Sequence, residues 1–226
     1  MRKEPLVTDE VYHVFNKSIA EFKIYNNNSE FSRMINVICY YQRCSPAIKF
    51  SSLIRSDEIK QNVSEGKILF SAINSHEDKF VEIIAYCIMP THIHLILKQL
   101  KEDGISEFMR IILDSYARYF NIKHKRKGPL WEGRFKNVHV KNDEQLLHLT
   151  RYTHLNPVTA YLVNRPEDWH ASSYKEYILA GKIDSHDRIC KYDDILDINP
   201  ALYREFVEDR ISYQRELAKI KDILIE

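Results

Sequence analysis

Glycine is scarce in this 226-residue sequence, which has only five, and neither GxGxxG nor GxxxxGK[ST] occurs. Phosphate-binding loops of both kinds depend on such glycines, so we expect no cofactor-binding residues for a nucleotide cofactor. The four cysteines show no CxxC spacing, which favours neither a zinc knuckle nor a disulfide framework. No apolar run is long enough to cross a bilayer, and the N-terminus has no apolar signal core. We therefore expect a cytoplasmic protein with no membrane partner.

Charge of either sign is nearly balanced, but it is unevenly distributed along the chain. Hydrophobic residues make up 44% and charged residues 29%, as in a folded domain with a sizeable core. The net charge is +1, yet residues 118–141 contain eight Lys or Arg and one acid. Residues 182–226 contain eight basic and eleven acidic residues. The neutral total conceals a basic middle and a mildly acidic end.

Hydrophobic periodicity predicts strands and helices in a mixed order. We predict strands over 11–16, 80–89, 92–98 and 135–141, and helices over 29–42, 106–124 and 143–156. The segment 45–79 has no consistent period, and residues 202–225 predict one long charged helix or two short ones. This order fits an α+β fold, a ferredoxin-like antiparallel sheet with helices packed on one face. We divide the chain into a main domain over residues 1–180 and a helical C-terminal extension over 181–226.

The predicted strand 92–98 places two imidazoles side by side. Because side chains alternate along a strand, His92 and His94 share one face with Ile96, while Ile93, Leu95 and Leu97 face the core. Neighbouring imidazoles are a starting point for a divalent-metal site. A structural role remains the alternative for such a pair. For His13 on the first predicted strand, we favour the structural role over a role in a site.

The last predicted helix of the main domain carries Tyr152 and Asn156 four residues apart, near one stripe of its surface. If that stripe faces the histidine strand, His92, His94 and the amide oxygen of Asn156 would form a site for Mg²⁺ or Mn²⁺. Such a metal would polarise a phosphodiester, and a deprotonated Tyr152 would attack phosphorus. The alternative is structural: the tyrosine packs in the core, and the asparagine ends the helix before the following proline.

Basic and aromatic residues follow one another in the middle of the chain. They predict a surface that contacts phosphates and stacks on bases, formed by Arg118, Lys123, Lys125, Arg126, Lys127, Trp131, Arg134 and Lys136. Base stacking suits a single-stranded or hairpin substrate better than a duplex, and a solvated loop is the alternative. Tyr116 and Tyr119 are competing nucleophiles. We interpret Tyr119 as a core residue and Tyr116 as nearer to DNA, and we prefer Tyr152.

Five segments in order resemble a known family. They are YHVFNK (12–17), MPTHIHL (89–95), LWEGRFK (130–136), YTHLNPV (152–158) and WHASSY (169–174). Together they resemble the HUH single-tyrosine transposases and are most similar to the branch of REP-associated tyrosine transposases. The resemblance spans about residues 12–177, so the extension lies outside it. Thr91 differs from many relatives, which have an acidic or amide residue before the histidine pair.

The resemblance implies a catalytic domain that uses Mg²⁺ or Mn²⁺ to cut single-stranded DNA near hairpins. His92 and His94 match the family's metal-binding pair, and Tyr152 matches its nucleophile. Asn156 matches the polar residue that can complete the metal site. The tyrosine would become linked to the 5′ phosphate and leave a 3′-hydroxyl that later rejoins strands without ATP. The expected location is the bacterial cytoplasm, at the nucleoid when the protein is bound to DNA.

Two other functions remain open. A domesticated relative would bind hairpin DNA or RNA without cutting it, although such a binder has no need of the histidines and the tyrosine. A zinc hydrolase would use the histidine pair but lacks an evident third ligand. The assembly is a monomer or a homodimer, and in a dimer the tyrosine helix would serve either its own histidines or those of the partner.

Overall fold

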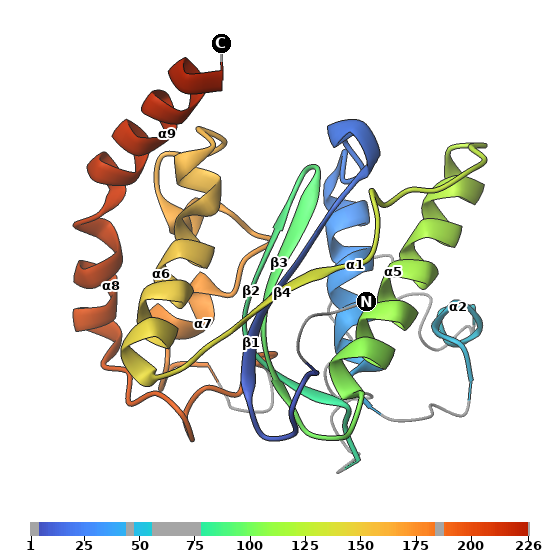
Figure 1. The fold of residues 1–226 in the computed structure, drawn as a ribbon, viewed down its shortest axis with the longest axis horizontal. Coiled ribbons are helices and arrows are strands. Elements are labelled where there is room, and N and C mark those ends of the chain that lie inside the picture. The colour runs from blue at the N-terminus through green and yellow to red at the C-terminus, as the bar shows by residue number, and fades with distance from the viewer. Residues whose placement is uncertain (1–4, 44–47, 56–77, 184–187, 226) are drawn as a thin grey trace.

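The computed structural model describes residues 5–43, 48–55, 78–183 and 188–225, with side chains as far as residue 218. At its centre is a four-stranded sheet in the order β2-β3-β1-β4 (Figure 1). The strands are β1 (Val11–Lys17), β2 (Val81–Met89), β3 (His92–Gln99) and β4 (Lys136–His139). Every neighbouring pair is antiparallel, and β2 and β3 form a hairpin at Pro90 and Thr91. The predicted α+β, ferredoxin-like fold is thus confirmed, except that helices cover both faces of the sheet and not one.

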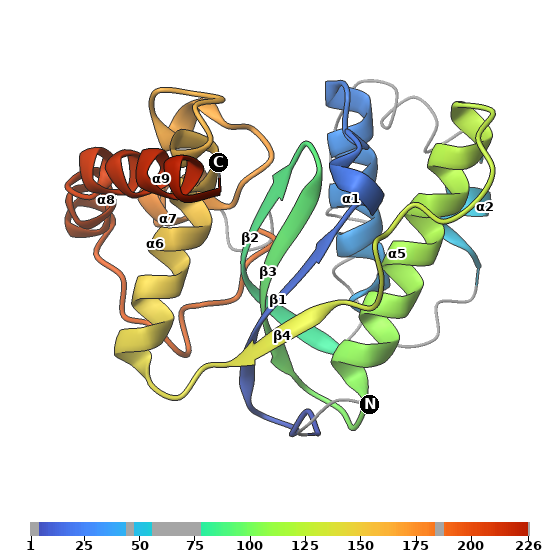
Figure 2. The same cartoon turned by 45° about the horizontal axis from the view of Figure 1, so that its top comes forward.

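Two long helices cover one face of the sheet, as Figures 1 and 2 show. Helix α1 (Asn28–Tyr41) begins where the side chain of Asn27 accepts a hydrogen bond from the backbone N–H of Glu30. Helix α5 (Gly104–Lys123) packs beside it. Apolar side chains of both helices join one core with the inward-facing residues of the strands, among them Ile93, Leu95 and Leu97. The predicted helices and the predicted core face of β3 are correct.

The other face of the sheet is covered by α6 (Asp143–Thr159), which contacts β2 and β3. The short helix α7 (Tyr174–Ile178) follows, and the C-terminal extension forms two helices, α8 (Pro200–Glu208) and α9 (Ile211–Ile225). In Figures 1 and 2, α8 and α9 lie on the side of α6 that is turned away from the sheet. Among the described residues, no helix combines the length and apolar character of a membrane span.

Helix α6 continues past the point where the sequence predicted its end. Pro157 has no N–H to donate to the carbonyl oxygen of Thr153, which normally ends or kinks a helix. The side-chain amide of Asn156 instead donates to the carbonyl oxygens of Tyr152 at 3.1 Å and Thr153 at 3.5 Å. The helix therefore runs on to Thr159.

Short elements escaped prediction. They are the helix α2 (Phe50–Leu53) and the 3-10 turns η1 (Ile19–Glu21) and η2 (Pro166–Asp168), together with α7. One or two helical turns are too short to show a period in the sequence. Most of the aperiodic segment 45–79 lies outside the described residues.

Gly104 opens α5 where the helix passes close to the backbone at residue 80, just before β2. A Cβ at this position would overlap the carbonyl oxygen of Phe80, which already accepts a hydrogen bond from the N–H of Leu100 at 3.0 Å. We expect Gly104→Ala to lower the free energy of unfolding by about 1–3 kcal/mol, measured by urea denaturation. Gly133→Ala is the matched control, because an added Cβ there has nothing within 4 Å. Equal stability of the two variants would contradict this packing.

Candidate active site

Strands β1 and β3 bring three imidazoles together on the face that α6 covers. His92 and His94 lie on β3 as predicted, and their ring centroids are 5.0 Å apart. His13 on β1 is paired with Ile96, which makes it a diagonal neighbour of His94 on the same face. The Nε2 atom of His13 lies 3.0 Å from Nδ1 of His94, and the two rings stack at 5.2 Å. The sequence did not predict this pairing, because it depends on the register between strands.

Burial keeps these imidazoles neutral. Removal from water lowers the pKa of His13 to about 4, and removal from water together with the charge of Lys17 lowers the pKa of His92 to about 4. Removal from water also lowers the pKa of His94 well below its ordinary value, with smaller contributions from the other two rings and Lys17. At neutral pH each ring is therefore uncharged and has a lone pair on one nitrogen, as a metal ligand requires.

Each histidine of the His-x-His pair uses Nδ1 within the protein. Nδ1 of His92 lies 2.9 Å from the hydroxyl oxygen of Thr91, and Nδ1 of His94 lies beside His13. Within the described part of the chain, the Nε2 atoms of His92 and His94 make no hydrogen bond. Metal-binding histidines typically engage their second nitrogen in this way, which fixes the ring and its tautomer. Thr91 thus supplies a contact to His92 from the position where the sequence departs from many relatives.

Tyr152 projects from α6 towards the same rings. Its ring centroid lies 5.8 Å from that of His94 and 6.2 Å from that of His13, with the planes nearly perpendicular in both pairs. The side chain is 41% exposed, so a ligand in solution can reach it, while burial of the remainder raises the pKa of the phenol. The histidines and the tyrosine meet within one chain, an arrangement that the sequence had left open.

Asn156 lies one turn after Tyr152, and its amide nitrogen donates to the backbone of its own helix. Within the described part of the chain, the side-chain oxygen of Asn156 makes no hydrogen bond and is therefore available to a ligand. It is not in contact with the histidines there. No group of three or more His, Cys, Asp or Glu among the described residues is placed to hold a metal. Any metal on His92 and His94 would thus need oxygen ligands of another kind, such as an amide, water or phosphate.

The two competing tyrosines lie on α5, on the opposite face of the sheet. Tyr116 is fully buried, and its hydroxyl donates to the carbonyl oxygen of Ile24 at 2.6 Å. Tyr119 is half-buried and accepts a hydrogen bond from Lys123 at 3.2 Å. The interpretation of Tyr116 as nearer to DNA is therefore wrong, because the helix turns Tyr116 inward against Tyr25 of the core. Tyr119 packs against the core, as predicted, but is only partly buried.

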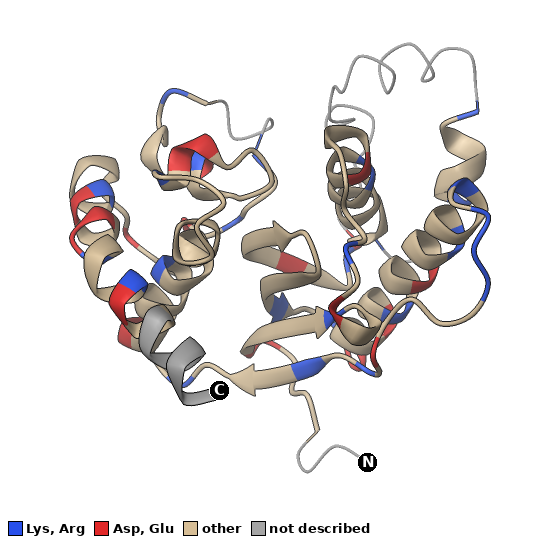
Figure 3. Cartoon of the chain, turned by 90° about the horizontal axis from the view of Figure 1, so that it is seen from above, with Lys and Arg blue, Asp and Glu red and all other residues tan. Residues whose placement is uncertain are grey.

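Apart from Arg118 within α5, the basic residues predicted to bind DNA fall into two groups, which Figure 3 shows at the end of α5 and at the start of β4. The first group is Lys123, Lys125, Arg126 and Lys127. Lys123 pairs with buried Glu30 at 2.8 Å, and Arg126 donates to the carbonyl oxygens of Gly128 and Pro129. Two of its four members therefore hold the local structure together. This group lies on the side of α5, away from α6.

The second group, Arg134 and Lys136, lies closer to the histidines. Both line a cavity of about 200 Å³ together with Phe15 and Lys17 of β1. The ring of Phe15 is 6.0 Å from that of His94, so this cavity borders the histidine face. Within the described part of the chain, Arg134 makes no hydrogen bond or ion pair. Its guanidinium is free to bind phosphate.

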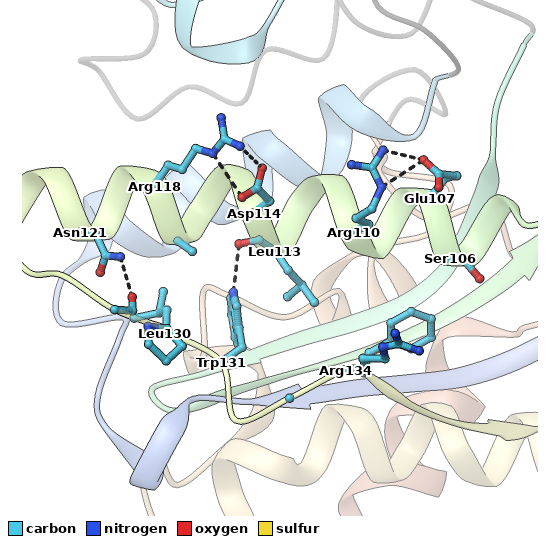
Figure 4. Close-up of a pocket in the computed structure, with 15 residues that line it drawn as sticks. Ser106, Glu107, Arg110, Leu113, Asp114, Arg118, Asn121, Leu130, Trp131 and Arg134 are labelled. Carbon is cyan, nitrogen blue, oxygen red and sulfur yellow. Dashed lines mark hydrogen bonds and ion pairs between the residues drawn. The ribbon is translucent and has the colours of Figure 1, made fainter. Parts of the chain in front are cut away.

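A larger cavity of about 1040 Å³ lies between α5 and the segment 128–135 (Figure 4), and we call it the α5 groove. Its apolar lining includes Leu113, Ala117 and Phe135, and Arg110, Arg118 and Arg134 also line it. Arg110 pairs with Glu107 at 2.6 Å and Arg118 with Asp114 at 2.8 Å. The indole N–H of Trp131 donates to the carbonyl oxygen of Leu113 at 2.9 Å, so this ring is fixed in the wall. The groove and the smaller cavity share Gly133 and Arg134.

Comparison with known proteins supports the resemblance. Residues 48–156 match the family model "Transposase IS200 like". A Haemophilus influenzae protein assigned to the REP-associated tyrosine transposases is 31% identical over 110 residues, covering 44% of this chain and 62% of that protein. The Escherichia coli K12 REP-associated tyrosine transposase is 26% identical over 110 residues, covering 48% of this chain and 64% of the relative. The chain thus spans less than two thirds of the length of either relative.

The fold agrees with these matches. The solved structure of a REP-associated tyrosine transposase bound to a REP hairpin superimposes with a TM-score of 0.53 at 17% identity, covering 88% of this chain and 94% of that one. The similarity at this identity concerns the fold, including the region beyond residue 156 that the family model does not reach. The chain is thus similar in sequence to the IS200-like transposases over residues 48–156 and to REP-associated tyrosine transposases over 110 residues, and it shares the fold of one of the latter.

Proposed function

We propose that the protein is a metal-dependent endonuclease and strand transferase for single-stranded DNA at hairpin-associated sites, with Tyr152 as the nucleophile. The observation that supports this most directly is the position of Tyr152, 5.8 Å from the ring of His94 in the same chain. The hairpin partner is proposed from the relative that was solved with a REP hairpin. A structural tyrosine would not require two buried imidazoles, a half-buried third and an exposed edge of its own ring at the same place.

The proposed reaction conserves the number of phosphodiester bonds. The hydroxyl oxygen of Tyr152 attacks a DNA phosphorus, the bond from phosphorus to the 3′ oxygen breaks, and the 5′ phosphate stays on the tyrosine. The phenol gives up one proton and the departing 3′ oxygen takes up one. In the reverse direction a DNA 3′-hydroxyl attacks the phosphotyrosine, which joins strands without ATP.

Mg²⁺ or Mn²⁺ fits the donor atoms of this site. The Nε2 atoms of His92 and His94 would bind it, Asn156 would offer an amide oxygen, and water or DNA phosphate would complete the set. A bound divalent cation supplies positive charge that polarises the phosphodiester and stabilises the phenolate. The role of His13 would be to accept a hydrogen bond from Nδ1 of His94 and so hold Nε2 of His94 ready.

The DNA strand would leave the histidine face across the start of β4. Lys136 and Arg134 line the small cavity beside Phe15, and Arg134 also lines the α5 groove. Cations beside apolar and aromatic surface suit unpaired nucleotides, whose phosphates and bases need both. We therefore include the α5 groove in the proposed DNA-binding surface.

The nucleophile can be tested by trapping. Incubation of labelled, hairpin-bearing single-stranded DNA with Mn²⁺ should give a protein–DNA adduct that survives denaturation. Tyr152→Phe should abolish the adduct while keeping DNA affinity, since only the attacking oxygen is lost. Tyr116→Phe, on the other face of the sheet, should still form it. An adduct in Tyr152→Phe would refute this assignment, and tight hairpin binding without any cleavage would favour the non-cleaving binder.

Metal binding can be measured by calorimetry with Mn²⁺ in the absence of DNA. His92→Ala and His94→Ala should remove binding, because each deletes a ligand. His13→Ala should weaken it about 10–100-fold, as expected for a residue that orients a ligand. His139→Ala is the control, because this histidine is on β4 and pairs with Glu10. Unchanged affinity in His94→Ala would show that the metal is bound elsewhere.

Filling the α5 groove tests its part in DNA binding. Ala117→Trp places a large ring in the groove and should weaken binding of a hairpin with single-stranded flanks by about 10-fold, while a hairpin without flanks binds as before. Ile122→Trp is the control, because this residue lies on the same helix, is 80% exposed and does not line the groove. Fluorescence anisotropy gives both affinities. Equal losses for both variants would exclude a specific role of the groove.

A further inference from the structure

A series of buried hydrogen bonds connects α6 to the C-terminal extension, on the side of α6 that faces away from Tyr152. The hydroxyl of Tyr203 on α8 donates to Oγ1 of Thr150 at 2.9 Å and lies 2.8 Å from Nδ1 of His154. Nε2 of His154 lies 2.8 Å from the hydroxyl of Ser173, which accepts a hydrogen bond from the backbone N–H of Tyr86 on β2 at 2.9 Å. This series therefore links α8, α6 and the central sheet.

The direction of each hydrogen bond follows from the partners. Thr150 donates its own hydroxyl hydrogen to the carbonyl oxygen of Leu147, so it can only accept from Tyr203. Tyr203 has then used its one hydrogen, and Nδ1 of His154 must donate to it. Nε2 of His154 carries no hydrogen and must accept, so Ser173 gives its one hydrogen to this nitrogen at 2.8 Å and not to the carbonyl oxygen of Tyr86, which lies 3.1 Å from the same hydroxyl. Thr150, His154 and Ser173 are fully buried and Tyr203 is 3% exposed, so water does not replace these bonds.

The network contacts the side of α6 that is opposite the nucleophile. Thr150 and His154 lie two residues before and two residues after Tyr152, which places each about 160° around the helix from it. Hydrogen bonds to both residues therefore fix the rotation of α6 about its axis. That rotation decides whether the phenol points at His94 and His13.

Two further contacts hold α6 to the extension. The guanidinium of Arg151 stacks 4.0 Å from the ring centroid of Phe206 on α8 and donates to its carbonyl oxygen at 3.4 Å. Arg215 on α9 donates to the carbonyl oxygens of Val158 and Val163 at 3.3 and 3.2 Å, close to the C-terminal end of α6. A cation there also interacts favourably with the helix dipole. The contacts of Arg151 and Arg215 limit movement of α6 along its axis, whereas the buried hydrogen bonds limit its rotation about that axis.

We propose that Tyr203 is a positioning residue for the transesterification, and that the extension serves to fix the nucleophile helix on its own sheet. The inference rests on the proposed function of Tyr152. The family model ends at residue 156, so its match does not reach Tyr203. Loss of this hydroxyl leaves the N–H of His154 without its acceptor and frees α6 to rotate.

The test compares two tyrosines that lose the same kind of bond. Tyr203→Phe removes the hydroxyl behind α6, and Tyr116→Phe removes a buried hydroxyl that donates at 2.6 Å on the other face of the sheet. Both variants should melt at lower temperature than the wild type. Under single-turnover conditions with saturating hairpin DNA and Mn²⁺, only Tyr203→Phe should slow adduct formation, by about 10-fold or more, because small misplacements are costly in rate. The hairpin Kd should stay within about twofold in both variants, since no DNA contact is lost.

A second readout needs neither DNA nor metal. The ring of Tyr152 stands edge-on to His94 and His13, so its ring current contributes to their carbon-bound proton signals in NMR spectra. In Tyr203→Phe these signals should move towards their positions in Tyr152→Ala, whereas Tyr116→Phe should leave them in place.

Each failure has its own signature. If the wild type forms no adduct, the proposed function fails, and the NMR comparison still tests whether Tyr203 sets the orientation of Tyr152. If Tyr203→Phe and Tyr116→Phe react at the same rate and show the same histidine signals, Tyr203 is only a stabilising core residue and the inference is overturned.

Discussion

Burial of β3 on both faces is the constraint on which the site depends. Helices α1 and α5 cover the face with Ile93 and Leu95, and α6 covers the face with His94, which is only 7% exposed. An imidazole taken out of water must stay neutral and must find partners for its polar nitrogens. Thr91 and His13 supply those partners at Nδ1. The interactions that make these histidines tolerable in a core are the ones that leave Nε2 available.

Helix α6, which covers the histidine face, also contains a backbone group that needs a partner, because Pro157 has no N–H to donate. A proline in the last turn removes one backbone hydrogen bond, and the side-chain amide of Asn156 compensates by donating to the preceding turn. The amide has two ends, so the nitrogen that repairs the helix leaves the oxygen available. Helix continuity and a possible metal-binding oxygen are thereby combined in one side chain. An aspartate here would offer an oxygen to the metal but has no N–H with which to repair the helix.

Local patterns were enough to predict half of the site. Alternation along a strand gave the common face of His92 and His94, and a step of four along a helix gave Tyr152. The pairing of His13 with His94 needed the register of β1 against β3, which no local period encodes. The contact of Tyr203 with His154 could not be predicted, because the two residues are 49 positions apart in the sequence. The error at Tyr116 arose in the same way, since the inward turn of α5 depends on where α1 and Tyr25 pack.

Charge and burial act together around the histidines. Lys17 lies opposite His92 in the sheet, and its charge contributes to the lowered pKa of both His92 and His94. The same ammonium lines the small cavity with Arg134 and Lys136, where a DNA phosphate would be attracted. A positive potential at this edge therefore favours two things at once: an anionic backbone beside the site and uncharged imidazoles within it. The total charge of the chain is nearly neutral, so the positions of Lys17, Arg134 and Lys136 matter more for such a site than the net charge does.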